Sequence, residues 1–231
     1  PAATCAGRSR GPGQRPVSTR RLRHMTPSST PRRLVVGISG ASGVIYGIRL
    51  LELLREVSDV KVHLVMSSTA KLNVHLETEW ALADVEAMAS EVHDCRDLAA
   101  GISSGSFRTS GMIVAPCSIK TLSGIANSNA DNLLTRAADV MLKERRRLVL
   151  MVRETPLHLG HCRLMVEAAT LGAIIAPPVP AFYNRPTTLN DVVDHAVARV
   201  LDLFDIDVPA MKRWAGVRPA KRKPQKTRPA P

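Results

Sequence analysis

The chain is poor in aromatic residues and has no long hydrophobic run. Phe, Trp and Tyr together make up 3% of its 231 residues, so an aromatic side chain near a candidate site is a scarce group. No stretch of about 18 uncharged apolar residues is present, which argues against a membrane-spanning helix. The four cysteines, Cys5, Cys95, Cys117 and Cys162, show no C-x-x-C spacing. A disulfide framework is therefore not indicated, and a reduced, cytoplasmic setting is favoured.

Acidic residues are missing from both ends of the chain. Residues 1–33 contain eight Arg, and residues 212–231 contain eight Lys or Arg, without an acidic residue in either segment. The net charge of +12 therefore belongs to the ends, because the residues between them carry 16 basic and 20 acidic side chains, a net charge of −4. We expect residues 1–31 to form a disordered basic extension, residues 32–211 a single domain, and residues 212–231 a C-terminal segment with a basic tail. An acidic core without a groove-reading motif argues against nucleic-acid binding.

The N-terminal residues also lack the long apolar core of a secretory signal peptide. Their Arg-rich, Ser-containing composition is compatible with an organelle transit peptide. An equally simple interpretation is that translation begins at Met25.

Short apolar segments alternate with helical patterns from residue 34 to about residue 206. Five segments rich in Val, Ile and Leu are typical of strands covered on both faces: 34–38, 61–66, 111–115, 148–152 and 173–176. Seven segments are typical of helices: 43–56, 69–76, 79–89, 119–127, 131–144, 158–170 and 190–204. This alternation predicts a three-layer α/β domain in which helices cover both faces of a parallel sheet. Ligands of such sheets bind at the carboxyl ends of the strands.

The loop after the first expected strand lacks both G-x-G-x-x-G and the lysine-bearing P-loop pattern. Gly37, near the end of that strand, nevertheless forms a regular spacing with Gly40 and Gly43 of the loop, and Ser39 and Ser42 add hydroxyl groups. Small side chains let a phosphate approach the backbone, and the first amides of the following helix point toward it. The pattern indicates an anion site, although an ordinary strand-to-helix turn has a similar composition.

The loop after the third expected strand offers a second set of donors. Pro116 is expected to end the strand, and Ser118 and Thr121 stand where the next helix begins. Backbone and hydroxyl donors for a ligand fit this pattern, and so does plain N-capping of the helix. Cys117 is expected to be a small buried residue rather than a nucleophile.

Two later loops carry charged or aromatic residues on the same expected rim. Arg153 and Glu154 directly follow the fourth expected strand, where Arg can hold a phosphate and Glu can move a proton. A surface ion pair is the alternative interpretation. The Pro-rich segment 177–186 presents Tyr183 and Arg185, either toward a ligand or as a packing lid.

Three other polar groupings have simple structural explanations. The polar turn at the start of segment 127–139 can line a pocket or cap a helix. Lys143 and the basic run 145–147 are typical of a solvated helix end. His158 and His161 lie three residues apart beside a cysteine, but no further ligand is evident, so a metal is not expected.

Seven segments, in this order, carry a resemblance to a known family: 37–43 (GISGASG), 105–107 (GSF), 116–121 (PCSIKT), 134–139 (LTRAAD), 142–146 (LKERR), 153–156 (RETP) and 180–183 (PAFY). Across residues 32–214 the chain resembles the UbiX-type flavin prenyltransferases, flavoproteins once described as aromatic-acid decarboxylases. The resemblance implies a flavodoxin-like (Rossmann-like) doubly wound sheet. It implies transfer of a dimethylallyl group from dimethylallyl monophosphate to N5 and C6 of reduced FMN. The product, prenylated FMN, serves a UbiD-type decarboxylase, often in ubiquinone synthesis. Members of the family form homo-oligomers, typically dodecamers, whose active sites are shared between subunits.

The resemblance also implies roles for individual residues. FMN binding is implied for Gly40, Ala41, Ser42, Ser67, Ser118, Ile119, Lys120, Thr121 and Arg153. Binding of the dimethylallyl phosphate is implied for Arg136, Lys143, Glu154, Tyr183 and Arg199, with Trp214 enclosing the prenyl chain. The implied catalytic residues are Ser42, Lys143 and Glu154, with Ser42 and Glu154 handling protons. Cations that stabilise a departing phosphate, an aromatic face near an allyl cation and a dry site agree with this chemistry, which needs no metal.

Other functions remain open at this point. An FMN-dependent cysteine decarboxylase shares the fold and a segment like 129–135, and His75 is a loose candidate for its catalytic histidine, but the expected Pro-x-Met-Asn motif is missing. A non-catalytic flavin-binding subunit is disfavoured by the presence of Lys143 and Glu154. The sequence does not distinguish a monophosphate donor from a pyrophosphate donor.

Overall fold

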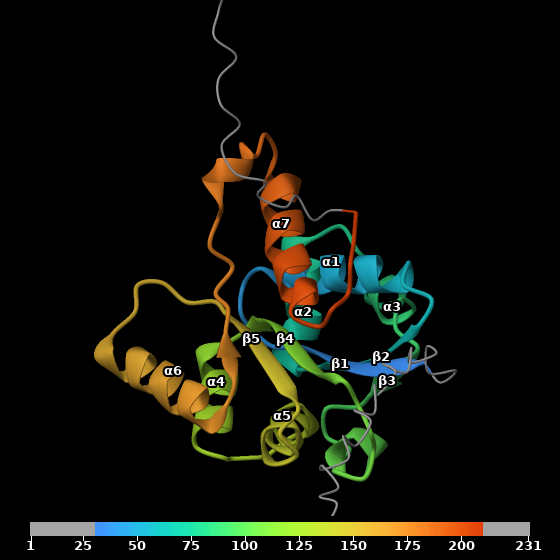
Figure 1. Ribbon diagram of the computed structural model, residues 1–231, viewed down its shortest axis with the longest axis vertical. Coiled ribbons are helices and arrows are strands. Elements are labelled where there is room, and N and C mark those ends of the chain that lie inside the picture. Colours follow the sequence, from blue (N-terminus) through green and yellow to red (C-terminus); the bar gives the residue numbers. More distant parts are fainter. Residues whose placement is uncertain (1–30, 210–231) are drawn as a thin grey trace, which may run out of the picture.

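The computed structural model describes residues 31–209, and its centre is a six-stranded parallel sheet (Figure 1). The strands are β1 (Arg32–Ile38), β2 (Val60–Met66), β3 (Glu91–His93), β4 (Gly111–Cys117), β5 (Arg147–Val152) and β6 (Ile174–Ile175). Their order in the sheet is β3-β2-β1-β4-β5-β6. Without the three-residue β3 this is the flavodoxin order, and the sheet reverses its direction of winding between β1 and β4. The predicted doubly wound α/β fold is confirmed.

Helices cover both faces of the sheet and complete three layers (Figure 1). One face packs against α1 (Val44–Arg55), α2 (Ser68–Glu77), α3 (Leu82–Glu86) and α7 (Leu189–Asp202). The other packs against α4 (Ile119–Ala126), α5 (Leu133–Lys143), α6 (Leu159–Leu171) and the short 3-10 helix η1 (Gly101–Ser103). A second 3-10 helix, η2 (Phe182–Asn184), precedes α7. Within residues 31–209 no helix is long and apolar enough to cross a lipid bilayer.

The central strands form because their side chains are buried on both faces. In β1, Val36 and Ile38 join the core beneath α1 and α7, whereas Val35 joins the core beneath α4 and α5. Continuous apolar runs are typical of such strands, and the five that the sequence predicts are all present. β3 was missed because it has three residues and exposes Glu91 and Val92.

The end of β4 differs from the prediction that Pro116 stops the strand. Pro116 does not end β4 but lies inside it, where the register with β5 shifts between Val114 and Cys117.

Helix α1 passes very close to the sheet at Gly47. A Cβ added there would lie 2.7 Å from Ile38 Cδ1 and would overlap the carbonyl oxygen of Ala115. The start of α1 is therefore held directly above the junction of β1 and β4.

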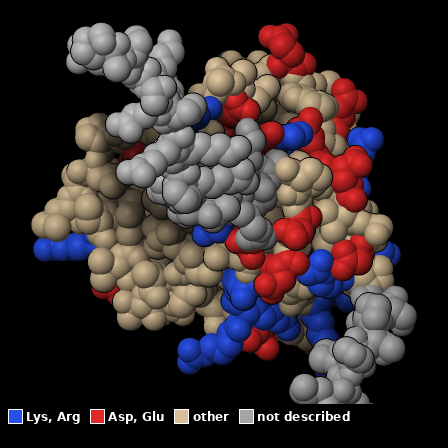
Figure 2. Space-filling model, turned by 45° about the horizontal axis from the view of Figure 1, so that its top comes forward, with Lys and Arg blue, Asp and Glu red and all other residues tan. Residues whose placement is uncertain are grey.

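Both signs of charge are present on the molecular surface. On the face that Figure 2 shows, Lys and Arg side chains gather toward one edge, and Asp and Glu side chains lie along another. This face does not present the continuous basic surface that a nucleic-acid backbone would need.

Candidate active site

A single groove lies where the strands of the sheet end. Gly40 follows β1, Ser67 follows β2, Ser118 follows β4 and Glu154 follows β5, and all four residues line this groove of about 1650 Å³. Ligand pockets usually measure about 300–1,000 Å³, so the groove has room for more than one small molecule. Its place at the carboxyl ends of the strands is the one that a doubly wound sheet predicts.

Helices α2 and α4 begin at this groove, and serines cap both. Ser67 Oγ accepts a hydrogen bond from the amide of Ala70 at 3.1 Å. Ser118 Oγ accepts from the amide of Thr121 at 3.3 Å. The first amides of a helix have no acceptor within the helix, so those of Ile119 and Lys120 are available to an anion. In the loop after β4, capping by Ser118 is therefore compatible with ligand binding by the free amides of Ile119 and Lys120.

The first turn of α1 already has an anion of its own. Glu77 Oε2 accepts from the amides of Gly43 at 2.8 Å and Val44 at 3.2 Å. A carboxylate at a helix N-terminus is stabilised by the helix dipole as a phosphate would be. In this structure these two amides therefore already have an acceptor, and a phosphate would have to displace Glu77 to reach them.

Ser39 has a structural role rather than the predicted role as a ligand donor. Its side chain is buried, and its hydroxyl donates to the carbonyl oxygen of Pro116 at 2.9 Å and accepts from the amide of Ser118 at 2.7 Å. These bonds tie the loop after β1 to the loop after β4. The two loops that line the groove are thus held at a fixed separation across the sheet.

Glu154 is the carboxylate at the end of β5. It lines the groove, and its Oε1 accepts from the amide of Thr155 at 2.9 Å. Arg153 does not line the groove: its amide donates to the carbonyl oxygen of Cys117 at 3.0 Å, and its side chain is exposed. The two side chains do not pair with each other, so the surface ion-pair interpretation is wrong for the described residues. Cys117 is fully buried, and burial raises the pKa of its thiol, as expected of a structural cysteine.

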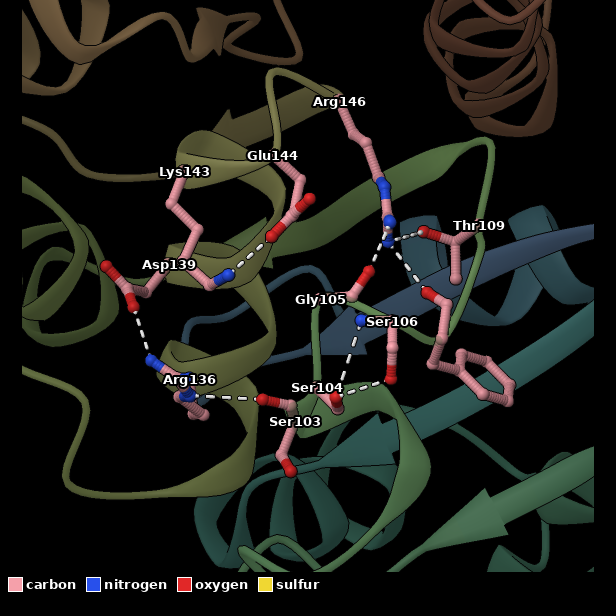
Figure 3. Close-up of polar contacts among 11 residues, drawn as sticks. Ser103, Ser104, Gly105, Ser106, Thr109, Arg136, Asp139, Lys143, Glu144 and Arg146 are labelled. Carbon is pink, nitrogen blue, oxygen red and sulfur yellow. Dashed lines mark hydrogen bonds and ion pairs between the residues drawn. The ribbon is translucent and has the colours of Figure 1, made fainter.

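Two of the predicted phosphate ligands lie on α5 (Figure 3). Arg136 donates to the carbonyl oxygen of Ser103 at 3.2 Å and to Asp139 Oδ2 at 2.7 Å. Lys143 Nζ lies 2.5 Å from Glu144 Oε1, and the hydrogen bond from this ammonium lowers the pKa of Glu144. Neither cation lines the groove, and each is paired with a nearby carboxylate, Arg136 with Asp139 and Lys143 with Glu144.

A loop of small residues lies beside these two cations, and Arg146 holds it in place (Figure 3). The Arg146 guanidinium donates to the carbonyl oxygens of Gly105 at 2.6 Å and Phe107 at 2.7 Å. The interpretation of the basic run 145–147 as a solvated helix end is therefore wrong for Arg146. Its contacts place the backbone of residues 105–107 against the end of α5.

Two further predicted phosphate ligands, Tyr183 and Arg199, lie across the sheet from α5, whereas Glu154 lines the groove. Tyr183, in η2, places its hydroxyl 3.1 Å from His195 Nε2, and Arg199, in α7, pairs with Asp202 at 2.8 Å. Because α7 and α5 cover opposite faces, one copy of the chain does not bring these residues together with Lys143. The predicted contact with Trp214 lies outside the described residues.

The remaining candidates are also placed. Ala41 and Ser42 follow β1 but do not line the groove; the carbonyl oxygen of Ala41 accepts from Asn73 Nδ2 at 3.1 Å, and Ser42 is exposed. His158 caps α6, with its Nδ1 accepting from the amide of Gly160 at 3.0 Å, and its ring lies against that of His161. His75 is exposed on α2 and outside the groove.

Sequence reasoning missed the contacts of Glu77 and Arg146: no local signal points to Glu77, and Arg146 was noted only as part of the segment 142–146 and of a basic run. Glu77 sits in a polar segment near the end of α2, and Arg146 sits in a run of three arginines. Both interpretations of the polar turn before α5, helix capping and pocket lining, are confirmed. Asn132 Oδ1 accepts from the amide of Thr135 and caps the helix, and residues of the turn line the groove.

Known proteins share this fold and much of this sequence. The family model described as Flavoprotein matches residues 22–198. The flavin prenyltransferase UbiX of Escherichia coli K12 is 63% identical over 187 residues, which are 80% of this chain and 99% of that protein. A crystal structure of AnUbiX (PadA1) in complex with FMN and dimethylallyl pyrophosphate is 50% identical, with a TM-score of 0.79, and covers 81% of this chain and 100% of its own.

A second solved structure agrees with the first. The dodecameric FMN-dependent UbiX-like decarboxylase from Escherichia coli O157:H7 is 52% identical, with a TM-score of 0.78, and covers 80% of this chain and 100% of its own. Identity at this level extends over nearly the whole of each relative. The chain therefore belongs to the UbiX flavin prenyltransferases, within the wider flavoprotein family.

Proposed function

We propose that this protein transfers a dimethylallyl group from dimethylallyl monophosphate to N5 and C6 of reduced FMN, and that the prenylated FMN is passed to a UbiD-type decarboxylase. The observation that carries the proposal is the groove at the carboxyl ends of β1, β2, β4 and β5, with helix starts at one part and a carboxylate at another. FMN and dimethylallyl pyrophosphate are the ligands named for the solved relative AnUbiX. The three free cysteines among the described residues fit a reduced, cytoplasmic setting.

The groove fits the requirements of FMN. Its phosphate needs hydrogen-bond donors and positive charge, and the groove offers the hydroxyls of Ser67 and Ser118, the first amides of α4 and the ammonium of Lys120. Gly40 lets the loop after β1 pass close to Thr69 at the start of α2, because any side chain at this position would collide with Thr69. Arg153 is the chain neighbour of the groove residue Glu154, and Ser42 is two residues from the groove residue Gly40; both side chains are exposed, and we assign both to the flavin.

The negative charge of the departing phosphate must be stabilised by cations, and the candidate residues of this chain lie on both faces of the sheet. We assign Arg136 and Lys143 on α5, and Tyr183 and Arg199 on the other face, to this phosphate. A phosphate that replaces the neighbouring carboxylates as partner would be held by charge-assisted hydrogen bonds, which stabilise the leaving group. Since the two sets lie on opposite sides of one sheet, a complete site requires more than one copy of the chain. The dodecameric relative is consistent with such an assembly.

Glu154 is positioned to handle protons during ring closure. It is the carboxylate that follows β5 in the groove, and among residues 31–209 its Oε1 accepts one hydrogen bond, from the adjacent amide of Thr155. One of its carboxylate oxygens is therefore available to a ligand. Exclusion of water by the assembled groove would protect a reactive allyl cation, and Trp214 is proposed to add an aromatic face.

The reaction itself is the direct test. Purified protein incubated anaerobically with reduced FMN and dimethylallyl monophosphate should release flavin that is heavier by one dimethylallyl unit in mass spectrometry. The pyrophosphate is supplied in a parallel reaction, and faster product formation with it would assign that ester as the donor. Tight FMN binding with recovery of unmodified flavin from both reactions would contradict the proposal.

Site sharing predicts that inactive variants restore each other. Lys143→Ala and Arg199→Ala should each be inactive, but co-expressed in equal amounts they should give about a quarter of wild-type turnover per site, because randomly mixed closed assemblies contain sites with both residues intact. The control pair, Arg136→Ala with Lys143→Ala, places both changes on α5 and should remain inactive. Turnover of the mixed assemblies is measured after co-purification with two different tags. Failure of the first pair to regain activity would show that one copy supplies both residues.

A further inference from the structure

Three metal-ligating side chains meet at the β2–β3 edge of the sheet, and none of them is assigned above to the reaction. His63 of β2 is paired in register with Glu91 of β3, and His93 follows two residues after Glu91 on the same strand. Residues two apart on a strand share a face, so the three side chains project from the same side of the sheet. His63 and His93 are buried, whereas Glu91 is 57% exposed on the solvent side of the pair.

The distances among their ligating atoms have the size that one bound ion requires. His63 Nδ1 lies 3.1 Å from His93 Nε2. The Glu91 carboxylate places one oxygen 3.4 Å from His63 Nδ1 and the other 3.6 Å from His93 Nε2. With bonds of about 2.0–2.1 Å, the ligand atoms of tetrahedral Zn²⁺ stand about 3.3 Å apart. The three measured separations bracket that value.

We propose that His63, His93 and Glu91 form a binding site for a divalent transition-metal ion of the Zn²⁺ type. Two imidazoles and one carboxylate are a ligand set that such ions accept, and the exposed side of Glu91 leaves the fourth position to water. The ring of Phe107 packs edge-on against His63, with centroids 5.1 Å apart, and holds that imidazole in its orientation. The three residues are already brought together by strand pairing, so binding needs little rearrangement.

The location gives the ion a structural role. β3 has three residues and a single neighbouring strand, so it is the least secured strand on this side of the sheet. A metal that joins His63 to Glu91 and His93 would fasten β3 to β2. His93 and the residues that follow it, Asp94 to Arg96, line the groove, so the ion would also fix one wall of the groove. This role is distinct from the chemistry of prenyl transfer.

Cobalt provides the test, because Co²⁺ in a tetrahedral site absorbs visible light far more strongly than hexaaqua Co²⁺. Untagged full-length protein is freed of metal with a chelator, titrated with Co²⁺ and then with Zn²⁺. We expect one equivalent of Co²⁺ to give the tetrahedral spectrum, Zn²⁺ to displace it, and Zn²⁺ to raise the thermal unfolding midpoint. Glu91→Gln and His93→Gln should each weaken binding at least about tenfold. The control His75→Gln, an exposed histidine on α2, should bind as the wild type does.

Two outcomes would overturn the proposal. A wild-type protein without the tetrahedral spectrum would show that the cluster is only a hydrogen-bonded histidine pair beside a carboxylate. Binding that is equal in the wild type and in Glu91→Gln would place the metal elsewhere. Because Glu91 is largely exposed, its replacement does not disturb the core, so this variant decides the question even where His93→Gln fails to fold.

Discussion

Replacing Glu154 by Gln should abolish most of the prenyl transfer while leaving FMN bound. Gln keeps the size and hydrogen-bonding reach of the side chain but cannot exchange a proton at neutral pH. Loss of a general acid–base group costs about 10²–10⁴-fold in rate, and we expect a loss in this range. The measurement is the rate of formation of prenylated flavin by mass spectrometry, with FMN affinity and the unfolding midpoint measured on the same preparation.

The control for this variant is Glu56→Gln. Glu56 is an exposed glutamate at the end of α1, so the same chemical change there should leave turnover unaltered. If Glu154→Gln retained full activity with FMN bound, Glu154 would not be the proton-handling group. If instead FMN affinity fell along with activity, its role would be in binding the flavin.

Replacing Gly47 by Ala should destabilise the protein markedly, against the intrinsic preference of a helix. Ala favours a helix interior over Gly by about 1 kcal/mol, so an unconstrained site would gain stability. At Gly47, however, the new methyl group would meet the Ala115 carbonyl oxygen and the Ile38 side chain. Overpacking of this kind costs typically about 1–3 kcal/mol, and more where backbone must move, so we expect a net loss of about 2 kcal/mol.

Thermal unfolding at a fixed protein concentration measures this loss. For a chain of this size, about 1 kcal/mol shifts the midpoint by about 2–4 °C, so a decrease of about 4–8 °C is expected. Gly172→Ala is the control: that glycine has φ +111° but nothing within 4 Å of an added Cβ, so it reports the backbone strain alone, about 1 kcal/mol. A midpoint that rises in Gly47→Ala would mean that α1 does not approach the sheet this closely.

The elements that could be predicted from the sequence are those with a strong local pattern. β1, β2, β4 and β5 are rich in Val, Ile, Leu and Met because both of their faces are largely covered, and α7 begins at a Thr188–Asp191 capping box. β3 has no such pattern, since it is short and half exposed. Its place at the edge is decided by pairing with β2, which is a tertiary contact.

The site residues that could be predicted from the sequence are those that lie at or near the ends of the predicted strands. Gly40, Ser67, Ser118 and Glu154 directly follow strands, and parallel strands deliver such residues to one edge. The contact of Glu77 with Gly43 joins residues 34 positions apart, and that of Arg146 with Gly105 joins residues 41 positions apart. Neither contact has a sequence signature, because helix packing sets it. The separation of Lys143 from Arg199 depends on which face each helix covers, and a linear motif does not record this.

The carboxylate partners of the assigned cations have a consequence for the binding of a phosphate. Arg136, Lys143 and Arg199 are each neutralised by a carboxylate within three residues along the chain. In the folded chain the net charge of each of these three ion pairs is therefore close to zero, although the side chains themselves stay partly exposed. If these cations bind a phosphate as proposed, the phosphate must displace a carboxylate at each of them, and its larger negative charge favours that exchange.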